Sequence, residues 1–329
     1  MRDALARFAH THEARLLAVT LALAAALSVA TDSFLTLQNL FDLLTSYAFL
    51  GILAAGLLVV LVAGGIDISF TATASVAQYV AMTLANAYGL DWVSVFLVAC
   101  GVGLACGLVN AWLIETLRIS SIIVTIATLN IFYGLLVFAT GGRYIYSLPD
   151  WFAKGIWWFE FVDADQIPYG INLQILLLVL AFAATWLLLN RTSVGRQIYA
   201  LGGNRDAAQR LGFNVFRLSL FVYGYMGLMA GVASLVQAQL AQSVAPTVLV
   251  GKELDVLAAV VLGGASLTGG VGTVLGTILG LTLLAVMQNG LVLIGVSSYW
   301  SQFFVGLVIL VAVSSTALNL RRRTRSVVA

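Results

Sequence analysis

The side chains of this sequence that could do chemistry are not arranged for catalysis. No glycine-rich loop of Walker A spacing occurs, and GxSxG and HExxH motifs are absent as well. His10 and His12 lie in a polar N-terminal tail with no cluster of cysteines or carboxylates beside them. Cys100 and Cys106 are six residues apart, which puts them on different faces of a helix. The sequence therefore predicts neither an enzyme nor a metal or cofactor held by this chain.

The chemistry that remains is hydrogen bonding by neutral side chains inside apolar runs. In lipid such groups hold helices together more often than they contact a solute. A supply of neutral donors and acceptors without chains of titratable residues nevertheless favours a neutral polyhydroxylated solute over an ion, and it argues against proton coupling. The amide side chains within the apolar runs are Gln78, Asn110, Asn130, Gln237, Gln239, Gln288, Asn289 and Gln302.

Asp67 is the one acid that interrupts the apolar block from Leu43 to Leu90, and it follows the Gly64-Gly65 pair. A charge at membrane depth marks a cavity, a polar partner or a helix terminus. Two interpretations stay open, a residue of a solute pathway and the cap of a half-helix that begins near Ile68. A second charged cluster is interpreted as a solvated ion-pair patch or as the rim of a vestibule, and consists of Lys252, Glu253 and Asp255.

The composition excludes a soluble globule. Hydrophobic residues make up 61% of the chain, charged residues only 9%, and the mean hydropathy is +1.02. The net charge of +2 gives no indication of a nucleic-acid partner. We expect an all-α polytopic membrane protein with about ten transmembrane helices, some of them broken or partly inserted. The apolar segments expected to cross are 16–31, 43–66, 68–90, 92–114, 119–142, 166–190, 218–251, 254–267, 273–293 and 300–317.

The distribution of positive charge predicts an orientation with both termini in the cytoplasm. With ten alternating crossings, only Arg143, Lys154 and Lys252 lie outside, as the positive-inside rule requires. The first apolar run contains Ala-x-Ala patterns of a cleavable signal peptide, but the later spans favour an uncleaved first helix. The outer loop 143–168 contains WFAKGIWWFEF and predicts a short interfacial helix in the lipid headgroup layer, with docking of a partner as the alternative.

The basic segment, GRQIYALGGNRDAAQRLG from Gly195 to Gly212, lies between two long apolar runs. Asn204 is suited to cap a brief helix from Arg205 to Leu211, which Gly212 would end in the left-handed conformation. Gly202-Gly203 would let the chain turn tightly just before that helix. The segment is either a handle for a soluble partner or an ordinary basic loop that orients the protein.

Two segments 199 residues apart echo one another, LLVVLVAGGIDIS (57–69) and LAAVVLGGASLTGG (257–270). A weaker echo relates NAWLIETLRISS (110–121) to NGLVLIGVSS (289–298). Transporters built from two repeats often break helices at corresponding places along the pathway, so we expect two pseudo-symmetric halves, although chance similarity of apolar stretches competes. The weaker echo fits inverted repeats, whereas the span count puts both Gly-Gly breaks on the inner side, which inverted repeats would not. The candidate pathway residues are Gly64, Gly65, Asp67, Ser69, Gly263, Gly264, Ser266 and Asn289.

Taken together, GGIDIS (64–69), the basic segment continued to Val215, ELDVLAAVVLGGASLTGGVGTVLGT (253–277) and NGLVLIGVSSYW (289–300) resemble the permease subunits of bacterial monosaccharide ABC importers. That group transports ribose, xylose, arabinose and galactose and has rhamnose and autoinducer-2 relatives. The resemblance covers the whole chain and implies one transmembrane permease domain, 1–329, in the bacterial inner membrane. It also implies three partners, which are a second copy or a paralogue, a cytoplasmic ATP-binding subunit and a periplasmic substrate-binding protein.

By the same resemblance, the loop 191–216 is a coupling loop where the ATPase docks, through Gly202, Gly203, Asn204, Arg205, Ala207, Ala208, Arg210 and Gly212. The chain departs from the family where Ile119-Ser120-Ser121 replaces a Pro-containing turn and Tyr133 replaces an arginine. The alternatives are an ABC permease for another solute, such as a branched-chain amino acid or urea, and a stand-alone secondary transporter or channel.

Overall fold

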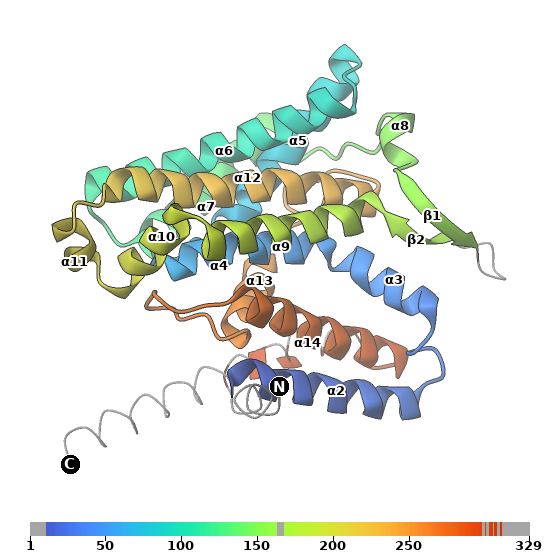
Figure 1. Ribbon diagram of the computed structural model, residues 1–329. Coiled ribbons are helices and arrows are strands. Elements are labelled where there is room, and N and C mark those ends of the chain that lie inside the picture. The colour runs from blue at the N-terminus through green and yellow to red at the C-terminus, as the bar shows by residue number, and fades with distance from the viewer. Residues whose placement is uncertain are drawn as a thin grey trace.

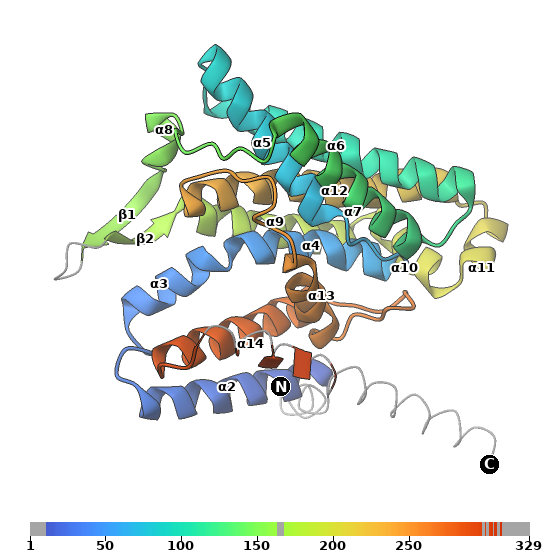
Figure 2. The ribbon, with the colours of Figure 1, turned by 180° about the vertical axis from the view of Figure 1, so that it is seen from behind.

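The computed structural model describes residues 11–162 and 168–297, with a few isolated positions between 300 and 310. Its helices lie side by side in stacked layers, α6 with α12, then α4 with α9, then α14 with α2 (Figures 1 and 2). The elements, in chain order, are α2 (His12–Ala30), α3 (Leu37–Ser46), α4 (Ala48–Val62), α5 (Phe70–Tyr88), α6 (Trp92–Leu117), α7 (Ser121–Thr140), α8 (Asp150–Ala153), β1 (Trp157–Val162), β2 (Pro168–Asn172), α9 (Leu173–Arg191), α10 (Ser193–Gly203), α11 (Arg205–Arg210), α12 (Val215–Ala241), α13 (Lys252–Leu262) and α14 (Val274–Leu293).

The long apolar helices make the chain a multi-pass membrane protein. Within the described residues, six helices are long and apolar enough to cross a membrane, namely α2, α6, α7, α9, α12 and α14. The pair α3 and α4, bent by 49°, would make a seventh. The expected count of about ten is not confirmed, and most of the expected span 300–317 falls outside the described residues. The expected broken helices are present in the bent pair and in α13, which has only 11 residues.

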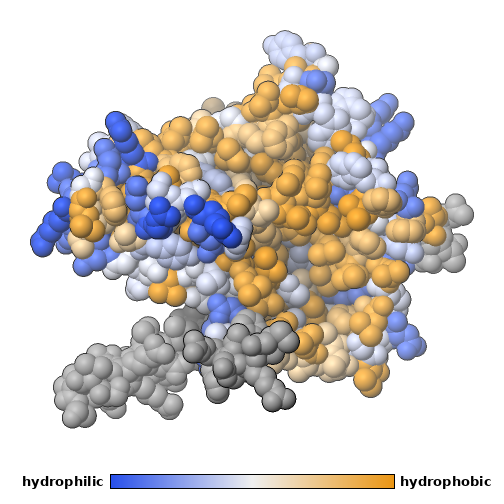
Figure 3. Space-filling view, viewed as in Figure 1, coloured by the Kyte–Doolittle hydropathy of each residue, from blue (hydrophilic) through white to orange (hydrophobic). Residues whose placement is uncertain are grey.

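The core is built around α4, which is apolar on all sides. Every residue of α4 except Leu50 is buried, so the helix has no lipid-facing or water-facing surface. It packs against α9, α12, α13 and α14. By contrast, large apolar side chains on α6 and α7 are exposed, as expected for helices that face lipid. Figure 3, viewed from the side of α9 and α12, shows apolar residues over the middle of the molecule and hydrophilic residues gathered at the end that carries α10 and α11.

Helices α6 and α12 cross with their backbones in contact. Gly103 and Gly107 of α6 face Gly227 and Gly231 of α12, and a Cβ atom on any of the four would overlap a backbone atom of the opposite helix. This small-xxx-small spacing lets two membrane helices approach closely enough for extensive van der Waals contact. The spacing is visible in the sequence, but the expectations above did not use it.

The end of the bundle opposite α10 and α11 carries an antiparallel hairpin, β1 paired with β2 through Glu160 and Gly170. The expected interfacial helix in WFAKGIWWFEF is therefore wrong, since only the four-residue α8 is helical there and WWFEFV is a strand. Aromatic and β-branched residues favour strand, and Gly170 lets the partner backbone approach Phe159. The fold is thus helical with one two-stranded sheet within the described residues, rather than purely all-α.

We expect Gly107→Ala to destabilise the protein by about 1–3 kcal/mol, because the new methyl group overlaps the Tyr223 carbonyl across the α6–α12 contact. The matched control is Gly101→Ala on the same helix, where nothing lies within 4 Å and alanine favours helix. Thermal unfolding of both variants in detergent measures the difference. Equal melting temperatures for the two variants would contradict the close helix crossing.

Candidate functional site

The basic segment folds into α10 and α11, and the helix predicted after Asn204 is confirmed. The Asn204 side chain accepts a hydrogen bond from the Ala207 N–H at 2.9 Å, which caps the first turn of α11. The helix closes at Gly212, whose φ of 85° is left-handed, while the Phe213 N–H donates to the Ala208 carbonyl at 3.2 Å. Ala208 is buried against the bundle, and Arg205, Ala207 and Arg210 are exposed.

The predicted tight turn at Gly202-Gly203 is wrong. Both glycines are the last residues of α10, and the direction changes at Asn204, whose φ of −160° is extended. Thr192 caps the start of α10 by accepting from the Gly195 N–H at 3.0 Å, and the buried side chains Ile198 and Leu201 hold it against the bundle. Gly202 is therefore needed for something other than turning.

The first break, residues 63–69 between α4 and α5, and the second break, residues 263–273 between α13 and α14, begin with the same backbone geometry. Gly64 and Gly264 both take left-handed φ values, 84° and 91°. Gly64 and Gly264 are 200 residues apart, whereas the sequence comparison aligned the two segments with a separation of 199. The structural alignment therefore differs by one residue, and Ala63-Gly64-Gly65 corresponds to Gly263-Gly264-Ala265. Helices α4 and α13 end with the same pair of backbone N–H···O=C hydrogen bonds. At the end of α4, Gly64 donates to Leu61 (2.9 Å) and Gly65 to Val60 (3.1 Å). At the end of α13, Gly264 donates to Val261 (2.9 Å) and Ala265 to Val260 (3.2 Å).

Both breaks lie at the end of the bundle that carries the basic segment. They meet the last turn of α10 at the glycines Gly64, Gly202, Gly269 and Gly270. A Cβ atom added to Gly64 would lie 3.3 Å from the Gly202 Cα, and one added to Gly269 would lie 2.6 Å from the Gly64 Cα. Because these contacts join backbones, the basic segment bears directly on both breaks.

The last carbonyl of each broken helix is satisfied by a different donor. The Val62 carbonyl at the end of α4 accepts from the Gly270 N–H of the second break at 2.9 Å. The equivalent Leu262 carbonyl at the end of α13 bonds the His12 Nε2 atom at 2.8 Å, at the start of α2. The Tyr199 hydroxyl of α10 donates to the Gly272 carbonyl at 2.6 Å, a second contact of the basic segment with that break. His12 and Tyr199 were not predicted, because contacts across such sequence distances leave no local signal.

Asp67 is buried, with 2% of its surface exposed, and belongs to the first break. Its carboxylate accepts from the N–H and the hydroxyl of Ser69, at 2.8 and 2.7 Å. Asn110 of α6 donates to the Ser69 hydroxyl at 2.7 Å. The half-helix expected to begin near Ile68 is α5, which begins at Phe70 with Ser69 as its N-cap residue. The Asp67 carboxylate therefore holds the turn just before the helix rather than occupying the cap position itself.

Helix α7 also contacts the first break, through the hydroxyl group of Ser121. Ser121 accepts from the Ile66 N–H at 2.9 Å, in the segment where the family turn contains proline.

The candidate pathway residues Gly263 and Ser266 lie at the second break, where Gly263 packs on the Gly276 backbone and Ser266 bonds Thr268. Asn289 is not part of this site, because it exchanges hydrogen bonds with Asn39 of α3 toward the other end of α14.

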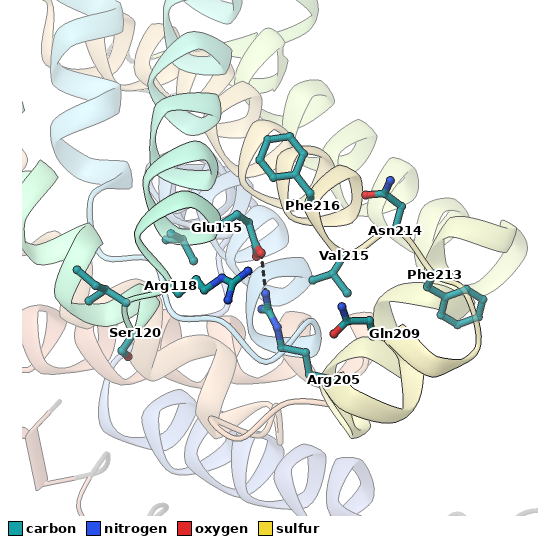
Figure 4. Close-up of a pocket in the computed structure, with 11 residues that line it drawn as sticks. Glu115, Arg118, Ser120, Arg205, Gln209, Phe213, Asn214, Val215 and Phe216 are labelled. Atoms are coloured by element: carbon teal, nitrogen blue, oxygen red, sulfur yellow. Dashed lines mark hydrogen bonds and ion pairs between the residues drawn. The ribbon is translucent and has the colours of Figure 1, made fainter.

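Glu115 ties three helices together at the same end of the bundle. Its carboxylate pairs with Arg205 of α11 at 2.6 Å and accepts from Ser219 of α12 at 2.5 Å. Figure 4 shows Glu115 and Arg205 pointing toward one another beside a cavity of about 780 Å³. Arg118, three residues after Glu115, is the C-terminal cap of α6 and takes a left-handed conformation (φ 55°).

The charged residues at the start of α13 make two separate sets of contacts. Lys252 and Asp255 form the predicted ion pair, at 3.2 Å, with the lysine side chain about half exposed. Glu253 is separate from it, because its carboxylate accepts from the Gly251 N–H and from the Thr71 hydroxyl of α5. Within the described residues no group of histidines, cysteines and carboxylates is arranged to hold a metal.

A helical membrane protein with two equivalent helix breaks held against a basic surface segment has the architecture of a transport permease. Comparison with known proteins agrees. The model of a family described as branched-chain amino acid transport system, permease component, matches residues 39–313. No solved structure was found to match.

Curated relatives extend over nearly the whole chain. The ribose import permease protein RbsC of Escherichia coli K12 is 34% identical over 310 residues, which cover 92% of each chain. RbsC of Bacillus subtilis is 34% identical over 286 residues, 87% of each chain. The autoinducer 2 import system permease protein LsrC of Yersinia enterocolitica is 34% identical over 306 residues, 92% of this chain and 81% of that protein. The chain belongs to this family of permease components, and the resemblance to monosaccharide ABC importer permeases is confirmed.

The glycine contact between α10 and the breaks can be tested by one pair of variants. We expect Gly202→Ala to lower stability by about 1–3 kcal/mol, since its methyl group overlaps the Val62 carbonyl and crowds the Gly270 N–H. Gly203→Ala is the control, because it is the next residue of the same helix and nothing lies within 4 Å of the place its methyl group would take. Thermal unfolding separates them, and an unchanged melting temperature for Gly202→Ala would show that α10 does not touch the breaks.

Proposed function

We propose that this chain is the permease subunit of an ATP-driven importer for a monosaccharide or a similar small polyhydroxylated solute. The observation that carries the proposal is the backbone contact of α10 with both helix breaks. In this proposal α11 is the docking site of a cytoplasmic ATPase, and its exposed residues Arg205, Ala207 and Arg210 face that partner. A displacement of α11 would pass through α10 to both breaks without a flexible side chain in between.

Glu115 supports the same route to the helices that flank the first break. Its bonds to Arg205 and Ser219 link α11 to α6 and α12, and α6 in turn holds the first break through Asn110. The Arg205 side chain is 56% exposed, so we attribute to this ion pair a positioning role rather than a large share of the stability.

The orientation follows from the same assignment. We place the end with α10 and α11 in the cytoplasm, together with both termini, and the hairpin end with α8 in the periplasm, where a substrate-binding protein would dock. The exposed aromatic side chains of the hairpin, Trp158, Phe159 and Phe161, suit the headgroup layer of the membrane. A second copy of the chain, or a paralogue, would complete the pathway.

The relatives support a sugar-like solute. The two ribose permeases and the autoinducer-2 permease are named for small hydroxylated compounds, whereas the family model carries the name of branched-chain amino acids. The neutral hydroxyl and amide groups buried in this chain, which match hydroxyl groups better than a charged amino acid, agree with the relatives. A stand-alone secondary transporter is the alternative, and it would need no ATPase.

The proposal predicts that Arg210→Glu or Ala207→Glu abolishes ATP-driven uptake while the protein stays folded, because both side chains are exposed on α11. Uptake of radiolabelled D-ribose and of a panel of other monosaccharides is measured in proteoliposomes that contain the permease, its ATPase and its binding protein. Arg15→Glu, an exposed arginine at the start of α2 and away from α11, is the matched control and should retain uptake. Normal ATP-driven uptake by the two α11 variants, or uptake by the permease without the ATPase, would rule out the proposed coupling.

A further inference from the structure

Helix α5 carries a polar face in the interior of the bundle. Thr71, Ser75 and Gln78 are spaced i, i+4 and i+7, which places them on one side of the helix. All three are fully buried. Polar side chains on such a face usually hold membrane helices together by hydrogen bonds to a neighbouring helix.

Two other helices contribute polar groups to the same face. The Thr71 hydroxyl donates to the Glu253 carboxylate at the start of α13, at 3.3 Å. The Tyr133 hydroxyl of α7 approaches the side chains of Thr71 and Ser75. The polar face of α5 is thus the meeting place of α5, α7 and α13.

Most of these polar atoms have no hydrogen-bond partner in the described part of the chain. The unpaired atoms are the Ser75 hydroxyl, both polar atoms of the Gln78 amide and the Tyr133 hydroxyl. Buried polar groups are almost always paired, and an unpaired one costs free energy. Gln239 and Gln288 show the usual pattern, since Gln239 donates to the Phe152 carbonyl and Gln288 accepts from Tyr47. Outside this face, the amide oxygen of Asn110 is also unpaired. The face of α5 is therefore poorly explained by packing alone.

Charged groups at the start of α13 lie close to this face. Figures 1 and 2 show the chain turning back from the hairpin end of α12 and entering α13 near the middle of the bundle. With 11 residues, α13 is about 16 Å long, so Lys252 and Glu253 lie no farther than about half the hydrocarbon thickness from the second break. The Lys252 side chain is 49% exposed at this depth. A charge there requires water rather than lipid beside it.

We propose that the polar face of α5, formed by Thr71, Ser75 and Gln78 with Tyr133 and Glu253 opposite, is a binding subsite for a hydroxylated solute on the translocation pathway. The inference rests on the proposed function and assigns the residues that contact the solute. Hydroxyl and amide groups both donate and accept, and a carboxylate accepts, so together they match the hydroxyl groups of a sugar. Because α5 starts three residues after Asp67 of the first break, movement of that break by α10 would shift this face against α7 and α13.

If this face binds the solute, substitutions on it will reduce transport without lowering the stability of the protein. Gln78→Leu and Ser75→Ala remove buried unpaired groups, so we expect melting temperatures equal to or above that of the wild type. Each loses contacts to the solute, so we expect D-ribose uptake by the complete importer in proteoliposomes to fall by about tenfold while ATP hydrolysis is retained. Gln288→Leu is the control, since it breaks a formed bond to Tyr47 and should lower the melting temperature. Normal uptake by Gln78→Leu and Ser75→Ala would overturn the inference.

A second measurement does not depend on which sugar is carried. Single cysteines replace Ser75 or Gln78 in a chain whose Cys100 and Cys106 have been changed to serine, and a small hydrophilic thiol reagent is added with and without ATP. We expect labelling of both positions during ATP turnover, and none of a cysteine at Ala74, which lies in the apolar core. Protection of positions 75 and 78 in every state would overturn the subsite. A wild-type complex that hydrolyses ATP but imports no sugar in the panel would instead refute the proposed solute class.

Discussion

The contact of backbone with backbone at glycine residues is the constraint on which the rest of this structure depends. Where Gly202 meets Gly64, Gly269 and Gly270, no side chain fits between α10 and the breaks. Side chains can change rotamer and absorb a displacement, but a packed backbone transmits it, since closely packed interiors are not easily compressed. Helices α6 and α12 cross with the same kind of backbone contact, through Gly103, Gly107 and their partner glycines, which makes the frame beside the basic segment closely packed.

The membrane makes the breaks costly, and the structure shows how each is stabilised. A helix that ends inside a bundle leaves carbonyl groups without intrahelical partners, and lipid offers no hydrogen bonds in exchange. Left-handed glycines close the last turn of α4 and α13 in the same way, but the final carbonyl of α4 uses the second break and that of α13 uses His12. Helix α2 therefore provides the hydrogen-bond partner for the last carbonyl before the second break, and the second break provides the partner for the last carbonyl before the first break.

The sequence predicts features whose causes are local and misses those made by distant residues. The cap at Asn204, the left-handed end at Gly212 and the breaks after α4 and α13 follow from residue types at short spacing, and all are confirmed. The role of Gly202 was predicted as turning because glycine permits turns, yet its missing side chain is needed for contact with two breaks that lie far away along the chain, one before it and one after it. Apolar runs cannot reveal whether a segment crosses, bends or pairs as a strand, which explains the unconfirmed span count and the missed hairpin.

The direction of the two breaks decides what one surface segment can move. In inverted repeats, equivalent breaks away from the bilayer midplane would lie on opposite sides of it, and one surface segment would not reach both. Here both lie beside α10, which thus contacts the break that precedes α5 and the break that precedes α14. These two helices are not equivalent. Along α14 the polar groups Thr277 and Gln288 are bonded within the bundle, whereas α5 carries Ser75 and Gln78 unpaired. The two breaks thus share their backbone geometry, but only the first leads into a helix with unpaired buried polar groups, and for this reason we propose a solute path along α5.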